Sequence, residues 1–169
     1  MPPRTFFWER LVDEALLNGL HCVLLAKIRE LGLSAPAEAV ERLRGLCAAS
    51  VQRNARLLEV WRSVRLGTPI KGLWLIESGF YQLWERPLSD ADLLVDDLDE
   101  ALSAFSKWGF CLHARTKTGA VVSDGELLFD LHATPFPPEL RVPKLKGLTP
   151  EHQALIVAVH LYKSTLSWG

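Results

Sequence analysis

The chain has 169 residues, of which 49% are hydrophobic, and a formal net charge of −1 at pH 7, which excludes a disordered chain and allows one domain with a sizeable core. Residues 67–100 contain two basic residues against eight acidic ones, so the sequence lacks the basic surface of a duplex-DNA binder. It also lacks an apolar run of about 18 residues that could span a membrane, a signal segment at its start, and any zinc spacing among its three cysteines, so we expect a cytoplasmic protein.

Residues 1–66 are predicted to form an antiparallel helical hairpin that packs on the core of the protein. Residues 6–32 form the first helix, because apolar residues recur every three or four positions, and Gly32 ends it. Pro36 suits the first turn of a second helix, which continues to about Arg65. The apolar stripe of the first helix consists of Leu17, Leu20, Leu24, Ile28 and Leu31.

Two polar residues accompany these helices. His21 lies beside the stripe of the first helix and is interpreted as a packed or surface histidine. Asn54 interrupts the apolar stripe of the second helix. It has two interpretations: a hydrogen bond to a neighbouring loop or helix, or an orienting contact near an active site.

A short strand and a glycine corner open the predicted core domain, residues 67–148. Gly72 allows the backbone to turn sharply into a helix over Leu73–Trp84. The backbone N–H groups of such a corner can bind an anion, and Lys71 adds a positive charge there. Arg86, in the loop that follows, could bind two phosphate oxygens or could form only a structural ion pair.

Two aspartates stand close together at the start of the next predicted strand. Asp90 and Asp92 are separated by one residue, so their side chains point to the same face of the strand. Adjacent carboxylates repel each other unless a cation or a proton lies between them, and the sequence therefore predicts a divalent metal site. The acidic residues that follow are interpreted as helix caps and surface charges: Asp96, Asp97, Asp99 and Glu100.

A third carboxylate lies in a later strand. Within the apolar segment Glu126–Ala133, Asp130 is costly to bury unless its charge is compensated. If this strand lies beside the strand of Asp92, Asp130 becomes the third carboxylate of the site, and His132 faces the same cleft. The remaining predicted elements are a helix that ends at Gly109, strands over residues 110–115 and 120–123, and a C-terminal helix within residues 149–169.

Three carboxylates at one site suit Mg²⁺ or Mn²⁺, which prefer oxygen ligands. Two such ions about 3.5–4 Å apart would activate an attacking hydroxyl and neutralise a leaving pyrophosphate. In this hypothesis Asp90 and Asp92 bridge the ions, and Asp130 binds the catalytic ion and helps the hydroxyl to lose its proton. The reaction moves a nucleoside monophosphate from an NTP to a hydroxyl of a protein, an RNA or a small molecule. The residues expected to bind the nucleotide phosphates are Lys71, Gly72, Arg86, Ser89 and His132.

Several short motifs of the chain occur together in one known family: Ile70-Lys-Gly, Tyr81, Arg86, Ser89-Asp-Ala-Asp-Leu-Leu-Val, Trp108-Gly-Phe and Phe129-Asp-Leu-His. With them the sequence resembles the uncharacterised nucleotidyltransferase family of the DNA polymerase beta-like superfamily. His21 and Asn54 agree with this resemblance, and His160 with Lys163 resembles an H-x-x-K feature. The resemblance implies a mixed sheet flanked by helices, two divalent metal ions and an NTP donor.

The chain departs from that resemblance in two respects. The superfamily commonly has Gly-Ser where this chain has Lys71-Gly72, so a serine hydroxyl is absent from the phosphate corner. Members of the family usually continue with further helices, which would shape the acceptor pocket.

The expected fold is α+β, with a nucleotidyltransferase-like mixed β-sheet flanked by helices, an N-terminal antiparallel helix pair and a C-terminal helix. We expect a second copy of the chain, a partner chain or a further helical segment to cover the apolar stripe of the last helix. Two other functions remain open. One is a catalytically weak nucleotidyltransferase-like module that acts by binding, for example in a toxin–antitoxin pair or a larger assembly. The other is a structural domain whose aspartates are only caps and surface charges.

Overall fold

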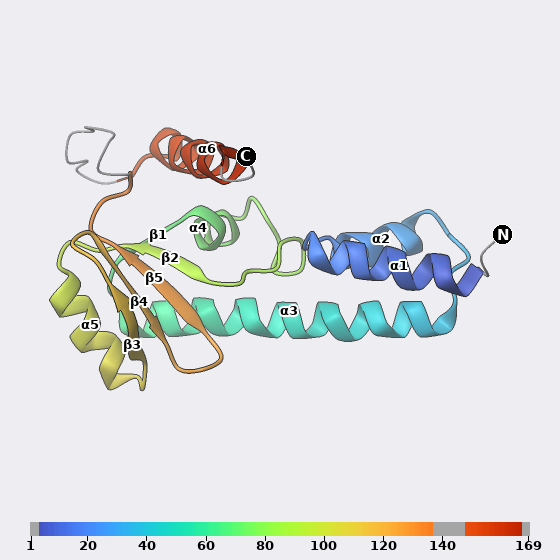
Figure 1. Cartoon of the computed structure of the whole chain (residues 1–169), viewed down its shortest axis with the longest axis horizontal. Coiled ribbons are helices and arrows are strands. Elements are labelled where there is room, and N and C mark those ends of the chain that lie inside the picture. The colour runs from blue at the N-terminus through green and yellow to red at the C-terminus, as the bar shows by residue number, and fades with distance from the viewer. Residues whose placement is uncertain (1–3, 137–147, 167–169) are drawn as a thin grey trace. The chain divides into compact units, whose positions relative to one another are not determined.

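The computed structural model of the chain describes residues 4–136 and 148–166 (Figure 1). These residues form an α+β protein with a five-stranded mixed sheet, an N-terminal helix pair and a C-terminal helix, which confirms the expected fold class. The chain divides into two compact units, one of Met1–Arg56 with Ser78–Leu88 and one of Leu57–Glu77 with Ser89–Gly169. The elements in chain order are α1 (Arg4–Leu17), α2 (His21–Glu30), α3 (Ala37–Val64), β1 (Thr68–Ile70), α4 (Lys71–Glu77), β2 (Ala91–Leu94), α5 (Leu98–Lys107), β3 (Cys111–Arg115), β4 (Gly119–Ser123), β5 (Leu128–His132) and α6 (Pro150–Leu166).

The first unit is built from α1, α2 and the N-terminal part of α3. As predicted, α2 and α3 run antiparallel, and Gly32 ends α2 in a left-handed conformation with φ of +59° (Figure 1). His21 Nε2 lies 2.9 Å from Ser50 Oγ, so a hydrogen bond links α2 to α3. Apolar side chains from all three helices form the core of this unit: Val12, Leu25, Ile28, Ala39 and Leu43.

The prediction of one continuous helix over residues 6–32 is wrong, because α1 ends at Leu17 and α2 begins at His21. Gly19 has φ of +66°, and the N–H of Leu20 donates to the carbonyl of Ala15, which is the hydrogen bonding of a glycine helix stop. The predicted stripe consequently does not form one buried face. Its members Leu17, Leu20 and Leu31 are exposed.

The predicted helix over Leu73–Trp84 is also too long, since α4 ends at Glu77 and Gly79 follows with φ of +75°. The segment Ser78–Leu88 belongs to the first unit, where the fully buried Asn54 holds it. Asn54 Nδ2 donates to the carbonyls of Leu83 and Arg86 at 2.7 and 2.8 Å, and its Oδ1 accepts from the N–H of Leu88 at 3.0 Å. This network confirms a hydrogen bond to a neighbouring loop as the reason for a polar residue in the stripe of α3.

The second unit contains the sheet, whose strand order is β1-β2-β5-β4-β3. Strands β2 and β5 are parallel, and the other neighbours are antiparallel. The alternation of buried and partly exposed residues along β5 shows that this strand presents different residues to its two faces.

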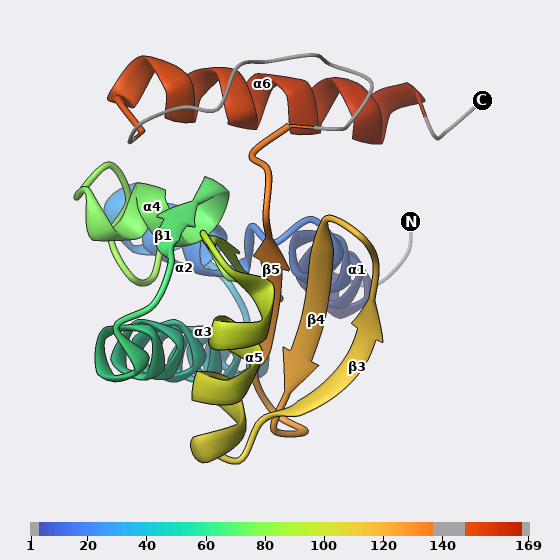
Figure 2. The same cartoon turned by 90° about the vertical axis from the view of Figure 1, so that its left-hand side faces the viewer.

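Helix α5 covers one face of β3, β4 and β5 (Figure 2). Asp97 caps its N-terminus by accepting hydrogen bonds from the N–H groups of Asp99 and Glu100, as the sequence predicted. The rings of Phe105 on α5 and Phe129 on β5 have centroids 4.8 Å apart. Because side chains alternate along a strand, Asp130 and His132 lie on the face of the sheet opposite to α5.

Helix α6 packs against the β1 end of the second unit. Ile156 is buried with Ile70 and Phe136, and Gln153 Nε2 donates to the carbonyl of Pro69 at 2.9 Å. Among the described residues, no helix has both the length and the apolar character needed to cross a membrane.

Candidate metal and nucleotide site

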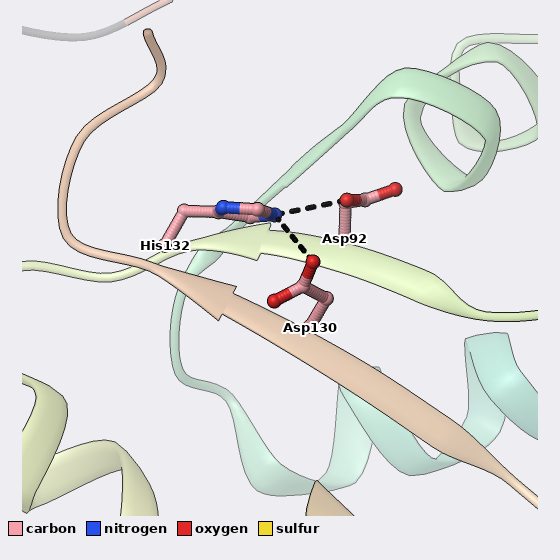
Figure 3. A group of neighbouring side chains, drawn as sticks. All are labelled: Asp92, Asp130 and His132. Carbon is pink, nitrogen blue, oxygen red and sulfur yellow. Dashed lines mark hydrogen bonds and ion pairs between the residues drawn. The ribbon is translucent and has the colours of Figure 1, made fainter. Parts of the chain in front are cut away.

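The parallel pairing of β2 with β5 places two carboxylates side by side. Asp92 and Asp130 are register partners across these strands, as the sequence required if Asp130 was to be the third carboxylate. His132 follows on the same face of β5. One ligand atom from each of these three residues lies within 4.8 Å of the others, and among the described residues this is the group that could hold a metal ion (Figure 3).

His132 bridges the two carboxylates. Its Nε2 lies 2.9 Å from Asp92 Oδ1 and 3.3 Å from Asp130 Oδ2 (Figure 3). Burial lowers the pKa of His132, but its hydrogen bonds to Asp130 and Asp92 outweigh this effect and raise the pKa to about 9. The imidazole is therefore protonated at neutral pH and balances part of the charge of the two carboxylates.

Lys71 is the second cation at this site. Its Nζ forms a hydrogen-bonded ion pair with Asp92 Oδ1, and both side chains are largely buried. Burial raises the pKa of the Asp92 carboxyl, but the hydrogen bonds from His132 and Lys71 and the charges of these residues lower it further than burial raises it. Asp92 is consequently a carboxylate at neutral pH with two cationic partners.

The corner that carries Lys71 differs in detail from the sequence-based expectation. The positive φ falls on Lys71, at +53°, whereas Gly72 is a buried residue of α4 and is not among the glycines with positive φ. A lysine in the left-handed region is uncommon, since its Cβ is crowded there. The sharp turn into α4 therefore uses the residue that contacts Asp92.

A cavity of about 360 Å³ opens beside the acidic group. One part of its lining is Lys71, Asp130 and His132, and another is the apolar surface formed with α6. This volume lies within the range of pockets that bind small molecules, about 300–1,000 Å³. The remaining lining residues are Ile70, Thr118, Thr134, Pro135, Phe136, Ile156, Val159 and His160.

The other predicted site residues occupy different positions. Asp90 precedes β2, accepts a hydrogen bond from Ser89 Oγ at 2.9 Å, and is not a member of the group of Asp92, Asp130 and His132. Ser89 is exposed. Arg86 belongs to the first unit, where its carbonyl accepts a hydrogen bond from Asn54, so its role in phosphate binding stays a prediction.

The cavity contains residues that the sequence did not single out. Thr118 lies in the turn between β3 and β4, and Thr134 and Phe136 follow β5. His160, noted from its H-x-x-K spacing, lines the same cavity, whereas the side chain of Lys163 lies outside the described residues. These positions are far apart along the chain, and no spacing rule would have grouped them.

The donor set of the acidic group fits a divalent cation. Carboxylate oxygens suit Mg²⁺ and Mn²⁺, and Asp92 and Asp130 each offer one within reach of a shared position. The imidazole of His132 could act as a third ligand after losing its proton, or could orient the two carboxylates by hydrogen bonding. The group could hold one shared ion, and Asp90 is not part of it.

The chain was compared with known protein families, curated proteins and solved structures. The model of a protein family described as "Uncharacterised nucleotidyltransferase" matches residues 5–148. This match includes β1, β2 and β5, which carry or flank the acidic group. No curated protein and no solved structure matches the chain.

Proposed function

The chain belongs to the uncharacterised nucleotidyltransferase family, and we propose that it transfers a nucleoside monophosphate from an NTP to a hydroxyl acceptor with release of pyrophosphate. The observation that carries this proposal is the pairing of Asp92 with Asp130 on adjacent parallel strands, beside a cavity large enough for part of a nucleotide. Two carboxylates held side by side repel each other, and a divalent cation that also binds phosphates would relieve this repulsion.

Asp92 and Asp130 would hold the cation, and Asp90 would complete the shell of a second ion. A divalent cation bound there would polarise the α-phosphate and neutralise charge on the departing pyrophosphate. Asp130 is the more accessible of the two paired carboxylates, with 32% of its side chain exposed against 10% for Asp92. It is therefore the better placed to accept the proton of the attacking hydroxyl.

The cationic residues would bind the nucleotide. His132 uses Nε2 for the two carboxylates, and its Nδ1 has no hydrogen-bond partner among the described residues. When the ring is protonated, Nδ1 is a hydrogen-bond donor that a phosphate oxygen could use. Lys71 lines the same cavity. Positioning and charge neutralisation of this kind are the main contributions that proteins make to phosphoryl transfer.

A second candidate function is a nucleotide-binding module with little or no catalytic activity. The observation that favours it is that both carboxylates of the paired strands already contact cationic side chains, Lys71 and His132. In such a module these ion pairs would persist, and the nucleotide would bind without a metal ion.

One labelling experiment tests both candidates. The protein is incubated with each NTP labelled at the α-phosphate, Mg²⁺ or Mn²⁺, and a cell lysate as the source of acceptors. Transfer predicts a labelled acceptor, which appears only with the metal and decreases at least about a hundredfold in Asp92→Asn. The matched control is Asp96→Asn, which removes an exposed carboxylate of the same unit. NTP binding without any labelled acceptor would favour the binding module.

A further inference from the structure

We infer that Lys71 is an internal counter-ion of Asp92, which a divalent cation displaces and which then binds the nucleotide phosphates. This role rests on the proposed function, and it goes beyond that function by making metal binding and nucleotide binding depend on each other. The consequence is a site that loads its metal ion and its nucleotide together.

The contact itself is the first support. Lys71 Nζ and Asp92 Oδ1 form an ion pair in which the two side chains are 18% and 10% exposed. A salt bridge this far from solvent is screened less than a surface pair. Lys71 and His132 thus share one carboxylate oxygen of Asp92, and Asp92 is the carboxylate that a metal ion would need.

The backbone at Lys71 is the second support. Of the described residues, only Arg65 and Lys71 have a positive φ without being glycine. Lys71 follows Ile70, which is the register partner of Asp92 on β1, so the left-handed conformation redirects the chain directly beside the acidic group. Strain of this kind persists where the surroundings hold it in place.

Charge balance explains why Lys71 must move. Without a metal ion, the carboxylates of Asp92 and Asp130 face two cationic side chains. A divalent cation at the same carboxylates would meet strong repulsion from an ammonium group that stays within hydrogen-bonding distance. The long, flexible side chain of lysine can move away from Asp92.

The cavity gives Lys71 a place to move to. Lys71 lines the cavity together with Asp130 and His132, so an ammonium group that leaves Asp92 can remain in the space where the nucleotide phosphates would lie. A phosphate there stabilises the displaced lysine, and the displaced lysine no longer opposes the metal ion. By thermodynamic linkage, each ligand then increases the affinity of the site for the other.

The first test is a calorimetric titration of the full chain with Mn²⁺ alone. Lys71→Met is expected to bind Mn²⁺ at least about fivefold more tightly than the unmodified chain, because the metal ion no longer has to break the ion pair with Asp92, and fivefold is the effect of two unit charges about 4 Å apart even at the dielectric constant of water. The matched control is Lys107→Met, which removes an exposed lysine of the same unit and should leave the affinity unchanged. Lys71→Gly is made in parallel, because it removes the amine and also relieves the positive φ, so it should fold even if Lys71→Met does not.

The second test repeats the titration in the presence of non-hydrolysable analogues of the four NTPs. In the unmodified chain, an analogue that binds should increase the affinity for Mn²⁺. In Lys71→Met and Lys71→Gly this increase should be reduced at least about fivefold, because the lysine that links the two ligands is absent.

The outcomes separate this inference from the proposed function. Unchanged or weaker Mn²⁺ binding in both Lys71 variants, with binding still lost in Asp92→Asn, would overturn the inference and leave the metal site intact. No Mn²⁺ binding by the unmodified chain or by either variant would overturn the metal site itself. Tighter binding in the Lys71 variants and not in Lys107→Met would support the displacement of Lys71.

Discussion

Asp92 and Asp130 are direct register partners on the parallel strands β2 and β5, and this pairing is the structural basis of the proposed activity. The two residues differ in their surroundings. Asp92 contacts both Lys71 and His132, whereas Asp130 pairs with His132. They should therefore respond differently to mutation.

Asp130→Asn is expected to separate activity from stability. Asp130 is about one third exposed and its ion pair with His132 is long, at 3.3 Å, but it is also the main partner that raises the pKa of His132, so the substitution should lower the free energy of unfolding by about 1–2 kcal/mol. If Asp130 binds the catalytic ion as proposed, the substitution should decrease transfer at least about a hundredfold. Denaturant unfolding and pyrophosphate release measure the two effects, and a large loss of stability with activity retained would contradict the assigned role.

The stability of the metal-free protein should depend on pH through His132. Its pKa rises from 6.5 to about 9 on folding, so between these values the folded chain holds a proton that the unfolded chain has lost. The contribution of this proton to the free energy of unfolding is complete below pH 6.5 and is lost as the pH rises through about 9. Its upper limit is about 3 kcal/mol. Thermal unfolding in the presence of a chelator measures this slope.

The matched variants for this pH dependence are His132→Gln and His113→Gln. His132→Gln should flatten the decrease in stability between pH 6.5 and 9. His113 is an exposed residue of the edge strand β3, so its substitution should leave the decrease unchanged. An equal slope in the unmodified chain and in His132→Gln would show that another group is responsible.

The sequence predicted the pairing that creates this site, but not the contacts that complete it. An aspartate within the apolar segment of β5, and another in the short strand β2, were sufficient to suggest adjacent strands. The glycine stops at Gly32 and Gly109 were also found from sequence, because each follows a clear helical pattern. Lys71 was expected to serve an anion, and its contact with Asp92 was not foreseen, because the direction of its side chain depends on a left-handed backbone that lysine rarely adopts.

The helix boundaries were predicted wrongly because a periodic pattern of apolar residues does not show where a helix stops. Leucines continue with helical spacing through the break after Leu17, so the periodic pattern concealed the glycine stop at Gly19. Asp90 was grouped with Asp92 by strand alternation; it lies one residue before β2, which begins at Ala91, and its role as a metal ligand stays a prediction. The cavity could not be predicted, because its lining comes from residues between Ile70 and His160 that only the tertiary fold brings together.

Asn54→Ala should destabilise the first unit strongly. The substitution leaves the carbonyls of Leu83 and Arg86 and the N–H of Leu88 without their buried partner. We expect a loss of about 3 kcal/mol or more in the free energy of unfolding. Gln52→Ala, an exposed position two residues earlier on α3, is the control and should change stability by about 0.5 kcal/mol or less. Equal effects of the two substitutions would contradict this role of Asn54.

Alanine at two glycines should have opposite effects. Gly67 has φ of +79°, and a Cβ there would lie 2.9 Å from Val95 Cγ1 and 3.1 Å from the carbonyl oxygen of Leu94, so Gly67→Ala should cost about 1–3 kcal/mol. Gly45 lies within α3 with no atom near its potential Cβ, so Gly45→Ala should stabilise the chain by about 0.5–1 kcal/mol. Chemical denaturation of both variants tests the comparison, and a stabilising Gly67→Ala would show that the turn before β1 is not constrained.

The position of a bound metal ion is the most direct test of a site at Asp92 and Asp130. Crystals of the protein grown with Mn²⁺ and a non-hydrolysable NTP analogue would be measured for anomalous scattering from manganese. We expect an anomalous peak shared by the carboxylates of Asp92 and Asp130, with the nucleotide phosphates beside it and Lys71 Nζ no longer on Asp92. A bound nucleotide with no manganese at these two carboxylates, or manganese bound only elsewhere, would show that they are not the metal site.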